Sequence, residues 1–309
     1  MSGLRDEATS AAFGIGWSAV KRMPESTARS LFRSLADRTY ERDGASVRQL
    51  RRNLARVRPD ATPAELEDLV RAGMRSYFRY WVEAFRLPAV PPQRIVDTHR
   101  IEGDAYLSSA LAARRGLVVA LPHSGNWDHS AAWATLTHEG LTAVAERLKP
   151  ESLYERFLDY RRSLGMEILP LTGGEHPVYE TLADRCRAGR FVALLADRDI
   201  SRNGVPVTLF GAEARVPAGP AALAVDTGAV LLPAALWFEE GRSVTRVGPP
   251  VIPAGRGDRA TRIAETTQAL VDALAEGIAE HPEDWHMMQP LWIEDLDERR
   301  LSRLDGGRP

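Results

Sequence analysis

The sequence LVVALPHSGNWD at positions 117–128 is the most informative stretch of this chain for its fold. It begins with five consecutive apolar residues, which predict a strand buried on both faces, as in a parallel sheet. A polar turn follows, and a helical pattern begins at Trp127. This order places His123 at the carboxyl end of a strand, where ligands of open α/β folds bind, and Asp128 in the next helical turn. We interpret His123 as a candidate general base and Asp128 as the carboxylate that orients it.

The chain after residue 94 alternates short apolar runs with helical stretches. We expect buried strands at residues 117–121, 141–145, 166–169, 191–196 and 229–236. We expect the helices between and after them at residues 127–138, 150–163, 175–189, 217–227 and 258–280. Strands that alternate with helices predict an α/β fold with a mainly parallel central sheet flanked by helices on both faces.

The first ninety residues have the pattern of helices instead. Thr62-Pro63-Ala64-Glu65 is a capping box with proline at the first helical position. The long helix that it starts has one apolar face and ends at Leu87-Pro88; the face consists of Leu66, Leu69, Val70, Met74, Tyr77, Phe78, Trp81 and Phe85. Such a stripe is more often core than a ligand groove. We expect an N-terminal helical subdomain over residues 1–93 and an α/β core over residues 94–309.

The composition narrows the class of protein. Cys186 is the only cysteine, which excludes an intrachain disulfide and fits a reducing cytoplasm. No window approaches 18 uninterrupted apolar residues, and the N-terminus lacks a signal-peptide pattern, so we expect neither a membrane span nor export. Residues 1–100 carry 18 basic and 12 acidic groups. This basic excess favours an anionic partner such as a membrane surface, with solvated helix faces as an equal alternative.

Several chemistries lack their motifs. The sequence has no Walker loop, no Gly-x-Gly-x-x-Gly after a strand and no Gly-x-Ser-x-Gly elbow. The remaining histidines have no paired spacing that argues for zinc, and no nucleic-acid motif accompanies the arginines at residues 48–58. We therefore expect no metal, no bound cofactor and no nucleic-acid partner.

A second His-x4-Asp pair, His99 and Asp104, tests whether the spacing alone is informative. It lies between the end of an expected strand and the start of a helix, and nothing there exposes the histidine to a pocket. We therefore choose His123 as the functional histidine, with a satisfied structural histidine as its alternative.

Polar residues follow three of the expected strands where each strand ends. These are His123, then Glu146-Arg147, then Asp197-Arg198-Asp199. Because the carboxyl ends of parallel strands share one edge of a sheet, we expect these groups to meet in one crevice, as a group-transfer site requires. Arg161, on a helix between them, is a further candidate contact for an anion, although a surface arginine is equally common.

The block His-Ser-Gly-Asn-Trp-Asp at 123–128 resembles the His-x4-Asp signature of the bacterial lauroyl/myristoyl (lipid A biosynthesis) acyltransferase family, part of the glycerophospholipid acyltransferase superfamily. The similarity extends through residues 51–54, 77–87, 197–199, 210–211, 217–221, 227–229 and 281–292. Within this family, the sequence is most similar to the actinobacterial branch that acylates phosphatidylinositol mannosides, at residues 128–133, 144–148 and 154–157.

The resemblance implies transfer of a long, palmitoyl-type acyl group from the co-substrate acyl-CoA to the 6-hydroxyl of a mannose on the inositol lipid. It also implies that His123 and Asp128 are the catalytic pair, with Asp197 as a carboxylate close to the histidine. Four further residues are candidates to contact the sugar or the acyl donor, or to support residues that do. They are Arg161, Glu146, Asp226 and Arg198.

Two other functions fit the same motif. One is an acyltransferase for another polar lipid, such as a lysophospholipid or glycerol phosphate, and the other is a catalytically silent lipid-binding relative. For membrane access, Phe13, Trp17 and Val20 form a stripe that suits an interfacial helix, with docking on the protein as the equal alternative. We expect a peripheral protein on the cytoplasmic face of the cell membrane.

Overall fold

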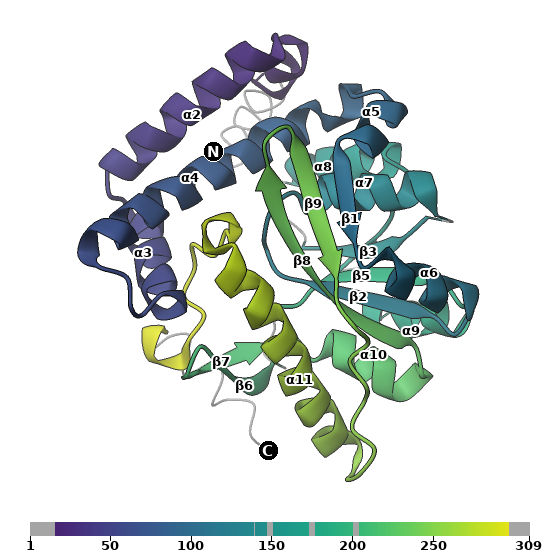
Figure 1. Ribbon diagram of the computed structural model, residues 1–309. Coiled ribbons are helices and arrows are strands. Elements are labelled where there is room, and N and C mark those ends of the chain that lie inside the picture. The colour runs from purple at the N-terminus through teal and green to yellow at the C-terminus, as the bar shows by residue number, and fades with distance from the viewer. Residues whose placement is uncertain (1–15, 139, 147–150, 173–176, 200–203, 297–309) are drawn as a thin grey trace.

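The computed structural model describes residues 16–296, apart from residues 139, 147–150, 173–176 and 200–203 (Figure 1). A helix over residues 16–22 opens the described chain. The later helices are α2 (Glu25–Glu41), α3 (Ala45–Val57), α4 (Pro63–Arg86), α5 (Pro92–Asp97), α6 (Asp104–Ala112), α7 (Trp127–Thr137), α8 (Glu151–Ser163), α9 (Val178–Arg187), α10 (Gly219–Thr227) and α11 (Arg259–Glu280). Short 3-10 turns lie at Leu87–Ala89, Pro282–Asp284 and Ile293–Asp295.

A seven-stranded sheet forms the centre of the molecule, in the order β1-β9-β8-β2-β5-β3-β4. Its strands are β1 (His99–Glu102), β2 (Leu117–Leu121), β3 (Thr142–Ala145), β4 (Glu167–Pro170), β5 (Phe191–Leu195), β8 (Val230–Glu239) and β9 (Arg242–Val247). Only β8 and β9 pair antiparallel; the other neighbours are parallel. The prediction of a mainly parallel central sheet with flanking helices is confirmed.

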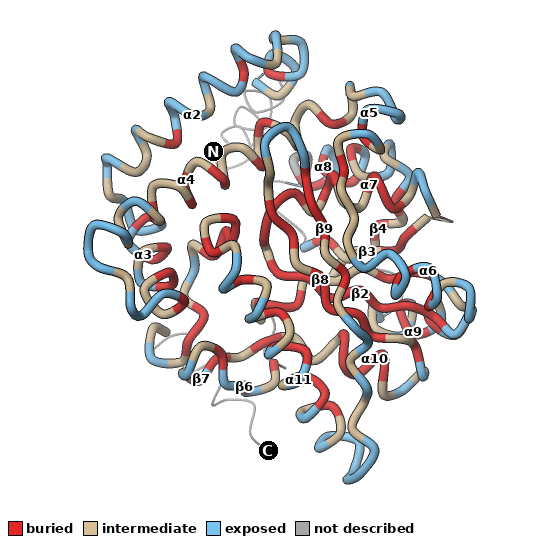
Figure 2. The backbone as a smooth tube through the Cα atoms, viewed as in Figure 1, coloured by how far each residue is buried: buried red, intermediate tan, exposed pale blue. Residues whose placement is uncertain are grey.

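Strand β2 explains why helices cover both faces. Successive residues of a strand point to opposite faces. Leu117, Val119 and Leu121 pack in one apolar cluster with residues of α6, α7 and α8. Val118 and Ala120 pack in another cluster with residues of α9, α10 and α11. All five residues of β2 are buried (Figure 2), which is why the strand reads as an unbroken apolar run.

The N-terminal helices pack around α4. At its start, the Thr62 hydroxyl accepts a hydrogen bond from the Glu65 backbone N–H, and the Glu65 carboxylate accepts one from the Thr62 N–H. This confirms the capping box. Helix α2 lies along the outer side of α4 (Figure 1), and α3 packs against α4 through the cluster around Leu50, Leu54 and Met74. No helix among the described residues is both long and apolar enough to cross a membrane.

Three strands were not expected from the sequence. Strand β9 carries Arg242 and Arg246 among its six residues, so it has no apolar run. The hairpin of β6 (Val205–Leu209) and β7 (Ala212–Val216) is half-exposed, and its strands alternate buried with more exposed positions. Strands with one solvent-exposed face have shorter apolar runs than buried parallel strands, because every second side chain can be polar.

The Phe13-Trp17-Val20 stripe does not face a membrane over its described part. The Trp17 ring lies 5.2 to 5.4 Å, centroid to centroid, from the rings of Phe85, Phe157 and Tyr160. Its indole N–H donates to the Phe85 carbonyl at 2.9 Å, and Val20 is buried. Phe13 lies outside the described residues. The interfacial interpretation is therefore wrong for Trp17 and Val20, because the protein itself buries their apolar surface.

Candidate active site

The register of the sheet brings His123 beside Asp197. Strands β2 and β5 are parallel neighbours, and Leu121 pairs with Leu195. Each strand continues for two residues into the loop at the carboxyl edge, to His123 on one side and Asp197 on the other. The predicted convergence of the strand ends is confirmed for this pair.

The Asp197 carboxylate makes three hydrogen bonds. Oδ1 lies 2.6 Å from Nδ1 of His123, Oδ2 accepts the His123 backbone N–H at 2.9 Å, and Oδ2 also accepts the Trp285 indole N–H at 2.8 Å. Burial opposes the charge of Asp197, but the charge of His123 and these hydrogen bonds outweigh it, so the pKa of the carboxyl lies below its ordinary value. A carboxylate at Nδ1 assigns the proton of the neutral imidazole to that nitrogen, which leaves Nε2 as the basic atom.

The carboxylate at the imidazole is thus Asp197, and the assignment of Asp128 as its orienting partner is corrected. Asp128 lies in the first turn of α7, as expected, but it is buried and its oxygens are occupied elsewhere. Arg161 donates to it from Nε at 2.8 Å, and the Tyr80 hydroxyl donates to it at 2.9 Å. Asp128 holds Arg161 from α8 against α7. Burial works against the charge of Arg161, and Asp128 more than offsets this, raising the pKa of the guanidinium.

A C-terminal segment, residues 284–286, fixes the turn that carries His123. The Gly125 N–H donates to the Asp284 carbonyl at 2.9 Å, and the His286 N–H donates to the His123 carbonyl at 2.8 Å. The turn needs glycine at Gly125, where φ is +55° and a Cβ would lie 2.9 Å from backbone atoms of β8. Residues about 160 positions apart therefore set the position of the histidine together.

A buried polar network supports this segment. The Ser76 hydroxyl donates to Asp284 Oδ1 at 2.5 Å and lies 2.8 Å from Nε2 of His286. The Phe238 N–H donates to the other Asp284 oxygen at 2.8 Å. Burial raises the pKa of Asp284 to about 6 and lowers that of His286 to about 3, the latter with a contribution from His123. Ser76 lies outside every motif described above. Asp284 and Trp285 lie within the stretch 281–292 that resembles the acyltransferase family, but no spacing or motif gave them a role.

A cavity of about 560 Å³ lies beside His123. Most of its wall is apolar and comes from α4, the edge of the sheet and α8; the side chains include Met74, Tyr77, Phe78, Trp81, Leu121, Trp127, Leu141, Phe157, Met166 and Ile168. Four of the α4 residues were interpreted as core, and this part of the stripe lines the cavity instead. A helix that borders a cavity needs the same apolar face as one that packs on a core, so the sequence does not separate the two.

The other predicted site residues divide into two groups. Arg161, Glu146 and Arg198 line the cavity, and Arg198 Nη2 lies 3.5 Å from Glu146 Oε2. Asp226 does not line it. That residue is near the end of α10, where it accepts hydrogen bonds from Tyr179 and, at 2.8 Å, from Arg259 Nε. The structure therefore brings three of these four residues to the site and gives Asp226 a different set of contacts.

His99, the histidine of the second pair, is buried in the core. Its ring stacks on Trp133 with centroids 4.9 Å apart, and burial lowers its pKa to about 3. It does not line the cavity beside His123. The choice of His123 over His99 agrees with this geometry.

Comparison with known proteins identifies the class. The family model for bacterial lipid A biosynthesis acyltransferases matches residues 6–294, and the chain belongs to this family. The expected acyltransferase is therefore confirmed. The chain is 48% identical, over 302 residues, to a phosphatidylinositol mannoside acyltransferase of Mycolicibacterium smegmatis, with 97% of each chain covered. It is 48% identical, over 305 residues, to the Mycobacterium tuberculosis protein of that name, with 98% of this chain and 94% of the relative covered.

Proposed function

We propose that this protein transfers a long-chain acyl group from acyl-CoA to the 6-hydroxyl of a mannose on phosphatidylinositol mannoside. The observation that carries the proposal is the pairing of His123 with the buried carboxylate of Asp197 at the wall of an apolar cavity. The names of relatives that are 48% identical over nearly the whole chain support the acceptor.

In the proposed reaction, His123 is the general base. Nε2 takes the proton of the sugar hydroxyl as that oxygen attacks the thioester carbonyl. The new C–O bond forms, the C–S bond breaks, and the imidazolium returns the proton to the departing thiolate of CoA. Asp197 orients the ring and stabilises the imidazolium, as a buried aspartate does in hydrolase triads. General-base assistance contributes about 10² to 10⁴ in rate.

The ion pair between Arg161 and the buried carboxylate of Asp128 has a separate role in this proposal. Asp128 fixes Arg161 at the cavity wall, where the remaining N–H groups of the guanidinium are able to donate to oxygens of the substrate. Arg198 and Glu146, also at this wall, are the other polar groups available to the acceptor or to the acyl donor.

The shape of the cavity supports an acyl substrate. Its volume lies within the range of ~300–1,000 Å³ that is typical of small-molecule sites. A smaller cavity of about 60 Å³, with an apolar lining, shares Leu121, Trp127, Ala131, Leu141 and Ala193 with it. We propose that the fatty chain occupies this apolar space while the thioester lies at His123.

We also propose that the protein works at the cytoplasmic face of the cell membrane, as a peripheral protein. Helix α2 supports this location, because it exposes the apolar side chains of Leu31 and Leu35. Exposed apolar side chains are typical of helices that lie on lipid surfaces.

The test is release of CoA from palmitoyl-CoA by the purified full-length chain, with analysis of the acylated product. We expect turnover with phosphatidylinositol mannoside and loss of turnover in His123→Ala. Faster turnover with lysophosphatidate or glycerol phosphate would replace the acceptor. Absence of acyl transfer to every acceptor, with acyl-CoA still bound, would favour a lipid-binding protein.

A further inference from the structure

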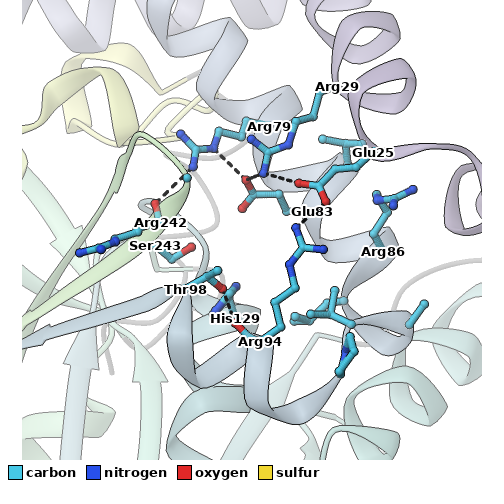
Figure 3. Close-up of a pocket in the computed structure, with 16 residues that line it drawn as sticks. Glu25, Arg29, Arg79, Glu83, Arg86, Arg94, Thr98, His129, Arg242 and Ser243 are labelled. Atoms are coloured by element: carbon cyan, nitrogen blue, oxygen red, sulfur yellow. Dashed lines mark hydrogen bonds and ion pairs between the residues drawn. The ribbon is translucent and has the colours of Figure 1, made fainter.

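A second cavity, of about 230 Å³, lies away from His123 (Figure 3). It is formed by the start of α2, the end of α4, the corner between α5 and β1, and the turn between β8 and β9. Its wall carries several arginines, which Figure 3 shows gathered with two glutamates from α2 and α4. Nothing in the proposed acyl transfer uses this cavity.

Three guanidinium groups share the two carboxylates. Arg29 Nη2 lies 2.9 Å from Glu25 and 3.5 Å from Glu83, Arg79 Nε lies 2.8 Å from Glu83, and Arg94 Nη2 lies 2.6 Å from Glu25. Burial opposes the charge of Glu25, but Arg94 and Arg29 outweigh it and lower its pKa. Both Arg29 and Arg94 use one nitrogen in these contacts. Since a guanidinium has five N–H donors on three nitrogens, each keeps most of its donors for another acceptor.

A fourth lining arginine, Arg86, adds positive charge without a carboxylate. Its Nη1 donates to the Val20 carbonyl at 2.9 Å and to the Met23 carbonyl. A fifth arginine, Arg242, also lines the cavity, so five guanidinium groups against two carboxylates leave an excess of three positive charges. Burial keeps the pKa of His129, at the same cavity, below its ordinary value, so this imidazole adds no charge at neutral pH.

We propose that this cavity binds the phosphate group of an anionic phospholipid at the membrane surface, with Arg29 and Arg94 as the principal contacts. The planar fork of arginine matches the geometry of phosphate oxygens, which accept paired hydrogen bonds. The position fits, because Arg29 is exposed on α2, the helix that also exposes Leu31 and Leu35. This inference rests on the proposed function only in that the protein works on a lipid surface.

Hydrogen bonds connect the cavity to the catalytic turn. Glu83 accepts a hydrogen bond from the Asn126 side chain at 3.2 Å, and Asn126 in turn caps α7 through the His129 N–H at 3.0 Å. Glu83 therefore joins the arginines of this cavity to the residue that ends the His123 turn. Occupancy of the cavity places the lipid surface at a fixed orientation to that turn.

The experiment measures binding of the purified full-length chain to vesicles at constant ionic strength. One set contains phosphatidylglycerol in phosphatidylcholine, and the other contains phosphatidylcholine alone. The test variant is Arg29→Gln with Arg94→Gln. The matched control is Arg33→Gln with Arg38→Gln, which removes two exposed arginines of the same helix that do not line the cavity. Arg94→Gln alone is the second variant. We expect it to fold, because an exposed ion pair contributes only ~0–1 kcal/mol to stability.

We expect the test variant to lose at least ten-fold more affinity for phosphatidylglycerol vesicles than the control variant, with little change on phosphatidylcholine. Equal losses in the two variants would overturn the proposal, because they would reflect diffuse attraction between a basic helix and an anionic surface. Unchanged binding in both variants would overturn it as well.

A second arm separates a lipid headgroup from a free anion. Inorganic phosphate is added to the wild-type chain and to the Arg94→Gln variant, and the melting temperature is followed against sodium chloride of equal ionic strength. Stabilisation by phosphate alone, without the difference in vesicle binding, would assign the cavity to a soluble phosphate and overturn the lipid assignment. Because neither arm requires turnover, failure of the acyl-transfer assay leaves both results interpretable.

Discussion

Replacing Trp285 by Phe removes one of the hydrogen bonds that hold the Asp197 carboxylate. The indole N–H donates to Oδ2 of Asp197 at 2.8 Å, and a hydrogen bond to a charged group contributes about 1.5–3 kcal/mol. Loss of this hydrogen bond raises the pKa of the carboxyl. The carboxylate must stay ionised to orient the imidazole, so we expect the acidic limb of the pH profile of kcat/KM to move to higher pH.

The matched control is Trp292→Phe. Trp292 is also fully buried, belongs to the same apolar cluster, and donates its indole N–H at 2.9 Å, but to the Leu209 carbonyl. Both replacements leave a cavity and should lower the free energy of unfolding by about 1–3 kcal/mol. Only Trp285→Phe should move the pH profile, measured from initial rates of CoA release. An equal movement in both variants, or none in either, would show that the Trp285–Asp197 hydrogen bond does not set the pKa of the carboxyl.

The remaining predictions concern the histidines and Asp284. His123→Ala should lower kcat by a factor of at least 10², and up to 10⁴, while acyl-CoA still binds. His99→Ala should keep most of the activity and lose stability, because His99 is a core residue. Equal losses of kcat in the two variants would mean that the wrong histidine was chosen. The pKa of Asp284 is raised to about 6 from 3.8, so the folded protein binds the extra proton and becomes less stable as pH rises from about 4 to 6. In wild-type protein the free energy of unfolding should fall by about 3 kcal/mol over that range, and in urea titrations Asp284→Asn should lack this fall. The same pH dependence in the variant would contradict the buried, protonated carboxyl.

The buried sheet was predictable because its strands are apolar on both faces. Each of the five strands expected from the sequence is present within a few residues of its expected limits. The same reasoning missed β6, β7 and β9, whose side chains are polar at many positions. The capping box before α4 was predictable because its hydrogen bonds join residues three positions apart.

The site was predictable only as far as the strand ends. A parallel sheet brings the residues after β2, β3 and β5 to one edge, so the sequence pointed to His123, Glu146 and Asp197 together. Which carboxylate reaches the imidazole depends on sheet register and on the direction of a helical side chain, and spacing alone favoured Asp128. The segment at 284–286 lies within a stretch that resembles the family, but its hydrogen bonds to the turn join residues about 160 positions apart, so no local pattern predicts those contacts.

The roles of Asp197 and Asp128 are tested most directly by kcat for acyl transfer in Asp197→Asn and in Asp128→Asn, under saturating acyl-CoA and acceptor. We expect the larger loss for Asp197→Asn, about 10³ to 10⁴, because an amide at Nδ1 favours the wrong tautomer and does not stabilise the imidazolium. Asp128→Asn should act mainly on KM and on stability, because it leaves the buried Arg161 charge without its partner. Near-wild-type kcat in a folded Asp197→Asn, or a larger loss of kcat in Asp128→Asn, would contradict the assignment of Asp197 as the partner of the base.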